Sequence, residues 1–217
     1  MSTASAPRIL PGPATPLVGA GLALPVPDNN MNIHYRRSLR LNGYDYAQSG
    51  AYFVTICTQN HECLFGCVDD GEMRLNDAGR VVRSVWQALP DRFSGMEWDA
   101  FVVMPNHVHG IATFVGAGLA LIGDKGAASG ATTLGDVVRA FKSLSAININ
   151  RLLRRSGPVW QRGYYDHVVR DNRNLDRIRE YIVTNPLKWT LDRENPQRTG
   201  ASPEEDDLFD LDHDTRV

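Results

Sequence analysis

Residues 98–114 read WDAFVVMPNHVHGIATF, two apolar segments that meet at Pro105 and Asn106. Both segments are rich in β-branched and aromatic residues, which is typical of strands. A break of only two residues predicts either a tight antiparallel pair or one bent strand. His107 and His109 are separated by one residue, and alternate side chains of a strand share a face. The two imidazoles are therefore expected to point the same way.

Outward from this segment, the chain alternates between strand-like and helix-like stretches. Strands are expected where β-branched and aromatic residues are dense, and helices where apolar residues recur three and four apart. The pattern predicts further strands at 51–59, 63–67, 72–75 and 164–170, and helices from 76 or 77 to 89, from about 133, and at 175–185. Hairpin-length connections between several strands predict an α+β fold, a ferredoxin-like antiparallel sheet with helices packed on one face.

Composition separates this folded region from its flanks. Residues 1–33 are rich in Pro, Gly and Ala and have almost no charge, so we expect a disordered extension. The folded domain is expected to cover residues 34–193, interrupted by a flexible Gly-rich insertion loop at 115–132. Residues 194–217 are acidic and are expected to form a disordered tail.

The formal net charge of −2 conceals an uneven distribution. Residues 139–193 contain 12 Lys and Arg against 5 Asp and Glu, whereas residues 194–217 contain 2 against 8. A basic half-domain is typical of nucleic-acid binding, but a solvated surface would have the same composition, so charge alone does not decide.

The cysteines and the apolar runs indicate in which cellular compartment the protein is expected. Cys57, Cys63 and Cys67 are odd in number and lack paired CxxC spacing, which argues against both disulfides and a structural zinc site. Reduced, half-buried strand cysteines are expected instead. The longest apolar runs are far shorter than the roughly 18 residues of a membrane span, and the N-terminus lacks the pattern of a secretory signal. We therefore expect a cytoplasmic protein with no membrane partner.

Tyr181 and Asn185 are four residues apart in a helical segment and hence share a face. Each taken alone fits an ordinary role, a half-buried aromatic residue and a helix C-terminal residue. Together with two histidines, an amide oxygen could hold a hard divalent ion that acts as a Lewis acid on a phosphodiester. A neighbouring phenol could then attack phosphorus, and the covalent phosphotyrosine would conserve the bond energy for rejoining.

Three segments resemble the REP-associated tyrosine transposases of the HUH class: MPNHVHG at 104–110, VWQRGYYDHVVRD at 159–171 and REYIVTNPLKW at 179–189. The resemblance extends from about residue 36, includes LNGYDY at 41–46, and ends at about residue 193. It implies the HUH endonuclease fold for the whole domain. The extension, the insertion and the acidic tail depart from the family pattern.

The resemblance also implies roles for individual residues. Tyr181 matches the nucleophile, His107 and His109 match the HUH histidines, and Asn185 matches the helix amide ligand. The family binds Mg²⁺ or Mn²⁺ and acts on single-stranded hairpin DNA of repeat elements, so the implied activity is nicking and strand transfer through a 5′-phosphotyrosine. The oligomeric state, monomer or dimer, does not follow from the sequence.

Additional DNA contacts are expected from basic residues on or after the second long helix, with His167 on the last strand as a residue that could orient a phosphate. The candidates are Arg139, Lys142, Arg151, Arg154, Arg155 and His167. Ordinary surface charge explains the arginines nearly as well. Trp160, by contrast, is interpreted as a core residue rather than a base-stacking one.

Three other functions fit parts of this pattern. The first is a domesticated protein that binds repeat hairpins, or represses nearby genes, without cutting. The second is a metal hydrolase that uses the same histidines, for which no sequence motif places an acidic base nearby. A rolling-circle initiator or relaxase would share the chemistry but usually has a longer chain.

Overall fold

The computed structural model describes residues 49–115 and 133–200, and every structural statement below refers to them. The expected disordered extension, the insertion from residue 116 onward and the tail beyond residue 200 lie outside the described residues. None of the described helices combines the length and apolar character that a bilayer span requires.

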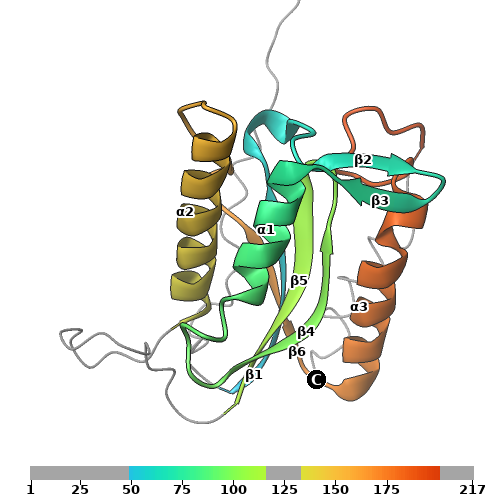
Figure 1. Cartoon of the computed structure of the whole chain (residues 1–217). Helices are drawn as coiled ribbons and strands as arrows, with labels where there is room; N and C mark the ends of the chain where they lie inside the picture. Colours follow the sequence, from blue (N-terminus) through green and yellow to red (C-terminus); the bar gives the residue numbers. More distant parts are fainter. Residues whose placement is uncertain (1–48, 116–132, 201–217) are drawn as a thin grey trace, which may run out of the picture. The chain divides into compact units, whose positions relative to one another are not determined.

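The main sheet has four strands in the order β4-β5-β1-β6, and all neighbours are antiparallel. The strands are β1 (Gly50–Cys57), β4 (Met96–Val103), β5 (His107–Phe114) and β6 (Tyr165–Val169). Helix α1 (Asp77–Gln87) connects β1 to β4, and α2 (Leu134–Leu152) connects β5 to β6. This βαββαβ order confirms the expected ferredoxin-like sheet (Figure 1).

Smaller elements complete the domain. Strands β2 (Gly66–Asp69) and β3 (Glu72–Leu75) form a separate hairpin, and η1 (Gln59–His61) follows β1. After β6 come α3 (Asn172–Thr184) and the short helix η2 (Asn185–Lys188). Side chains cap all three long helices, because Asn76, Thr133 and Asp171 each accept a hydrogen bond from a backbone N–H in the first turn.

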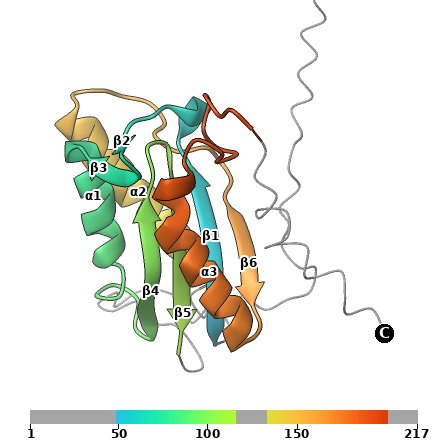
Figure 2. The same cartoon turned by 90° about the vertical axis from the view of Figure 1, so that its right-hand side faces the viewer.

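The helices lie on both faces of the sheet, which corrects the expectation of one covered face. Helices α1 and α2 pack against Val54, Val108 and Ala112 in the larger core, as the sequence predicts. Helix α3 crosses the opposite face, where Ile178 and Ile182 pack on Phe53 and Ile111 (Figure 2). The second face of β1 and β5 is also apolar, so it needs a cover of its own.

One ion pair with two hydrogen bonds fixes α3 to β4, the edge strand of the sheet. Arg179 Nε and Nη2 donate to the two carboxylate oxygens of Asp99 at 2.8 and 2.7 Å. The Arg179 guanidinium holds the pKa of the Asp99 carboxyl below its usual value. Because two parallel hydrogen bonds restrict both distance and rotation, this contact sets the position of Tyr181, which is two residues further along α3.

Gly110 follows the two histidines on β5 because the strand has no room there for a side chain. A Cβ atom at Gly110 would lie 2.5 Å from Trp86 on α1 and 3.0 Å from Phe101 on β4. The Trp86 and Phe101 rings are stacked with centroids 4.5 Å apart. The glycine thus lets α1 pack directly on the strand that carries His107 and His109.

We therefore expect Gly110→Ala to lower the free energy of unfolding by about 1–3 kcal/mol, the usual cost of overpacking a core. Urea denaturation measures the change. Gly50→Ala is the matched control, because its Cβ would meet only the Tyr52 side chain at an ordinary 3.8 Å. Equal stability of the two variants would contradict this account of the close contact.

Candidate active site

The two histidines lie on the α3 face of the sheet, buried between β1 and α3. His107 is 0% exposed and His109 is 3% exposed. The antiparallel register pairs Thr55 with His109 and Cys57 with His107. The Phe53 ring stacks on the His109 ring at a centroid distance of 5.4 Å. The shared face that the HxH spacing predicts is confirmed, and the strand pairing holds both rings in place.

Asn106 determines the tautomer of His107. Its Nδ2 donates to the backbone oxygens of His61 at 3.2 Å and Glu194 at 2.6 Å. Carbonyls only accept, so the amide nitrogen must face them, and Oδ1 then faces His107 Nδ1 at 2.8 Å. Since Oδ1 can only accept, Nδ1 carries the proton, and the Nε2 lone pair is directed away from Asn106.

Thr55 supports His109 differently. The Thr55 hydroxyl lies 2.9 Å from His109 Nδ1. A hydroxyl can both donate and accept, so Thr55 holds the ring orientation without selecting a tautomer. Through Asn106 and Thr55, both Nδ1 atoms have partners and both Nε2 atoms are directed toward each other.

The Nε2 atoms of His107 and His109 are 3.0 Å apart. Burial lowers the pKa of His109 to about 3 and holds the pKa of His107 well below its usual value. Both rings are therefore neutral at physiological pH. Neutral imidazoles that converge in this way can share one proton in a hydrogen bond, or they can both coordinate a metal ion.

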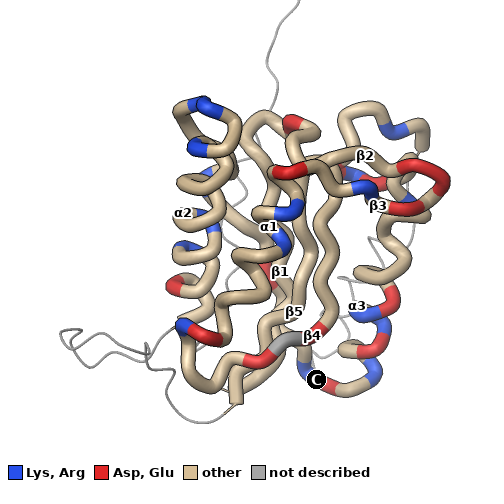
Figure 3. Tube along the Cα trace, in the orientation of Figure 1, with Lys and Arg blue, Asp and Glu red and all other residues tan. Residues whose placement is uncertain are grey.

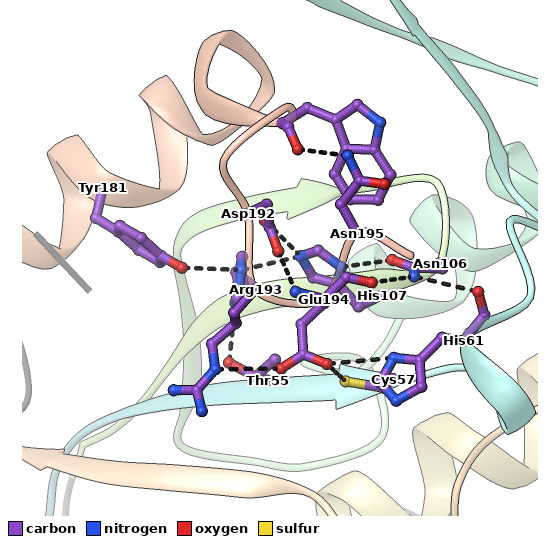
Figure 4. A network of polar contacts seen from close by, with 12 residues as sticks. Thr55, Cys57, His61, Asn106, His107, Tyr181, Asp192, Arg193, Glu194 and Asn195 are labelled. Atoms are coloured by element: carbon purple, nitrogen blue, oxygen red, sulfur yellow. Dashed lines mark hydrogen bonds and ion pairs between the residues drawn. The ribbon is translucent and has the colours of Figure 1, made fainter. Parts of the chain in front are cut away.

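Helix α3 brings the candidate nucleophile to this pair. The Tyr181 hydroxyl lies 3.4 Å from His109 Nε2 (Figure 4). Asn185, one turn later at the end of α3, is 1% exposed. Its Oδ1 is buried without a hydrogen-bond partner among the described residues. A buried amide oxygen without a donor costs free energy, so a ligand that is absent here would explain it.

Asp192 joins the site, although no motif in the sequence indicates it. It is 2% exposed, and its Oδ2 lies 3.6 Å from His107 Nε2. The atoms of His107, His109 and Asp192 that could bind a metal lie within 4.8 Å of one another. Asp192 follows η2 at the margin of the expected domain, and no helical or strand spacing relates it to the histidines.

The folded segment continues past Arg193, where the acidic tail was expected to begin. Asn195 is 9% exposed and donates to the Trp189 backbone oxygen at 2.8 Å. Glu194 lies beside Cys57 and His61 (Figure 4). Contacts made by Glu194 and Asn195 thus hold the segment that carries Asp192 next to the histidines.

Lys and Arg residues lie along α2 and in the loop after it (Figure 3), and the candidates among them make different contacts. Arg151 and Arg154 are exposed, Arg139 pairs with Asp136, and Arg155 pairs with Glu62. Lys142 Nζ lies within 3.3 Å of the backbone oxygens of Gln161, Arg162 and Gly163. Three acceptors use the three protons of an ammonium, so Lys142 anchors the loop before β6.

His167 shares the sheet face of the histidine pair but has other partners. It lies opposite Phe53 in the β1–β6 register, and its Nε2 is 3.3 Å from Asn174 Nδ2 in the first turn of α3. Trp160 is 6% exposed and donates to Ser145 Oγ at 2.9 Å, which confirms it as a core residue.

Two sequence relatives match the chain, although no family model does. An uncharacterized protein of Haemophilus influenzae is 39% identical over 178 residues, which cover 76% of this chain and 95% of that protein. A second protein of the same organism, named "Putative REP-associated tyrosine transposase", is 27% identical over 145 residues, which cover 66% of this chain and 74% of that protein. The chain is thus similar in sequence to a protein named as a putative REP-associated tyrosine transposase.

A solved structure of a REP-associated tyrosine transposase bound to a REP hairpin also matches. It is 21% identical, covers 67% of this chain and 71% of its own, and gives a TM-score of 0.45.

Burial of the histidine pair predicts a pH dependence of stability. The folded pKa of His109 lies below that of the unfolded chain, so the unfolded chain binds more protons between about pH 3 and 6.5. In this window stability falls as pH falls, by up to about 1.4 kcal/mol per pH unit for each histidine.

Urea unfolding in the presence of a chelator tests this prediction at pH 5 and pH 7. His109→Gln removes one titrating group and should lose less stability than the unmodified protein between these two pH values. Identical losses in the two proteins would contradict the assignment of a neutral, buried His109.

Proposed function

We propose that this protein is a REP-associated tyrosine transposase, which nicks single-stranded hairpin DNA and transfers the cut strand through a covalent 5′-phosphotyrosine at Tyr181. The contact between the Tyr181 hydroxyl and His109 Nε2, 3.4 Å, carries this proposal. It brings a nucleophile from α3 next to a buried pair of neutral imidazoles on β5. The resemblance of its motifs to the REP-associated tyrosine transposases, together with a relative of that name, supports hairpin DNA of repeat elements as the substrate class.

The donor set fits a divalent ion. An octahedral ion with ligand distances of 2.0–2.1 Å separates neighbouring ligand atoms by about 3.0 Å. The two Nε2 atoms are 3.0 Å apart. The Asp192 carboxylate and the Asn185 Oδ1 without a partner would add oxygen ligands, which Mg²⁺ and Mn²⁺ prefer. Bound there, the ion would supply Lewis acidity toward a phosphate oxygen.

The bond-making and bond-breaking steps take place at Tyr181. Tyr181 Oη attacks phosphorus, and its proton passes to a water molecule as the new O–P bond forms and the bond to the 3′ oxygen breaks. The departing oxygen takes up a proton and leaves as a 3′ hydroxyl, while the 5′ phosphate stays on Tyr181. Attack by another 3′ hydroxyl reverses these steps, which joins a new strand and frees the tyrosine.

The position of Asp192 beside His107 supports one alternative function. A carboxylate beside His107 could act as the base of a water-activating hydrolase, a function for which the sequence places no acid. A hydrolase would release both strand ends and would not need Tyr181. A non-cutting hairpin binder would release neither end.

Tyr181→Phe is expected to bind hairpin DNA with unchanged affinity and to form no covalent adduct. Labelled hairpin oligonucleotides with Mg²⁺ or Mn²⁺, analysed on denaturing gels, measure the adduct. Tyr165→Phe is the matched control, because Tyr165 also lies near Phe53 but on β6. An adduct that persists in Tyr181→Phe would contradict the nucleophile, and cleavage without any adduct would indicate the hydrolase.

Thr55→Val tests the metal-binding histidine independently of DNA. Loss of the hydroxyl leaves His109 Nδ1 without its partner, and such losses weaken metal affinity by about 10–100-fold. Titration of Mn²⁺, with free Mn²⁺ measured by electron paramagnetic resonance, gives the affinity. Thr113→Val on β5 is the control and should bind Mn²⁺ normally. Unchanged affinity in Thr55→Val would remove Thr55 from the site.

A further inference from the structure

A second cluster of potential metal ligands lies next to Asn106, on the side of its amide that faces away from His107. Cys57 ends β1, His61 ends η1, and Glu194 follows η2. Glu194 Oε2 lies 3.4 Å from Cys57 Sγ and 3.3 Å from His61 Nδ1. All three ligand atoms are within 4.8 Å of one another (Figure 4). The proposed nicking reaction uses none of these three side chains.

The spacing of these atoms fits a tetrahedral metal ion. With a Zn–S distance of about 2.3 Å and Zn–N and Zn–O distances of about 2.0–2.1 Å, tetrahedral angles separate sulfur from oxygen by about 3.6 Å and nitrogen from oxygen by about 3.4 Å. The measured separations from Glu194 Oε2 are 3.4 and 3.3 Å. A metal ion could enter with small side-chain movements.

The backbone around the cluster is already fixed. Asn106 Nδ2 donates to the backbone oxygens of both His61 and Glu194. Asn60 and His61 both have positive φ angles, 56° and 53°, which side-chain-bearing residues seldom adopt. Such conformations persist only where the surrounding contacts enforce them. The loop thus holds His61 opposite Glu194 at a conformational cost.

A neighbouring amide orients the His61 ring beside the cluster. Gln161 Nε2 lies 3.0 Å from His61 Nε2 and donates to it, which leaves the ring proton on Nδ1, facing Glu194 Oε2. A metal ion at Nδ1 would displace this proton to Nε2, where the Gln161 oxygen can accept it once the amide is turned.

We infer that Cys57, His61 and Glu194 form a second metal site, which binds Zn²⁺ and clips the C-terminal segment to the end of β1. A thiolate, an imidazole and a carboxylate suit Zn²⁺ rather than Mg²⁺ or Mn²⁺, and a water molecule would complete the tetrahedron. The clip joins residues 137 positions apart, Cys57 and Glu194. It holds the segment that brings Asp192 to His107.

Co²⁺ reports on this site specifically. It replaces Zn²⁺ in tetrahedral sites, and only a thiolate ligand gives an intense sulfur-to-cobalt charge-transfer band in the near ultraviolet. The full-length, reduced, metal-free protein should develop this band with one equivalent of Co²⁺ and lose it when Zn²⁺ is added. The pair His107 and His109 offers no sulfur, so Co²⁺ bound there is silent in this band.

Variants locate the ligands. Cys57→Ser should abolish the band, and the matched control Cys63→Ser, which changes an exposed cysteine, should keep it. Glu194→Gln should weaken Co²⁺ binding at least about tenfold while its circular dichroism stays native. Absence of the band in the unmodified protein, its persistence in Cys57→Ser, or unchanged affinity in Glu194→Gln would overturn the inference.

The result is separable from the proposed transposase activity. Tyr181→Phe and His107→Ala should retain the charge-transfer band, because neither residue contributes to the second cluster. Loss of the band in His107→Ala would show that thiolate-bound cobalt depends on the histidine pair, which would overturn a separate second site. The band requires no DNA, so a failed nicking assay leaves this test intact.

Discussion

The pairing of β1 with β5 is the constraint on which the rest of the site depends. It sets Thr55 opposite His109 and directs both imidazoles to one face of the sheet. The same alternation sends Val108 and Gly110 to the other face, where α1 and α2 bury them. A shift of one residue in this register would exchange the faces and put the histidines into the larger core. The apolar packing of two helices therefore enforces the orientation of the two polar side chains.

Helix α3 turns this orientation into a potential reaction centre. The second face of the sheet is apolar at Phe53 and Ile111, so its cover has an apolar stripe of its own, Ile178 and Ile182. Tyr181 precedes Ile182 on α3, which places it at the margin of the stripe, half-buried, with its ring edge-on to Phe53 at 6.1 Å. The packing that buries the isoleucines, together with the Arg179–Asp99 ion pair, thus also places the phenol beside the histidine pair.

Periodic features of the sequence predicted most of the fold, whereas contacts between distant segments could not be predicted. Alternation and helical spacing identified the sheet, the three long helices and the face shared by His107 and His109. Asp192 and Glu194 were not recognised as site residues, because an acidic residue after the last helix looks the same whether it is solvated or buried. Lys142 illustrates the converse. Its place on a basic helix suggested a phosphate contact, but the carbonyls that take its protons lie about 20 residues later.

The two histidines have different hydrogen-bond partners, the Asn106 amide for His107 and the Thr55 hydroxyl for His109. Each partner suits the protonation states that its histidine must adopt. Asn106 uses both amide protons on carbonyls and its oxygen on His107, so an aspartate there would lose both donations. It leaves His107 Nε2 as an acceptor in every state. Without a metal ion, His109 Nε2 can donate its proton to that acceptor at 3.0 Å, and His109 Nδ1 then accepts from Thr55. With a metal ion, Nε2 must lose its proton and Nδ1 must gain one, so the Thr55 hydroxyl becomes the acceptor. A threonine can make this exchange by rotating one O–H bond, and neither ring has to move.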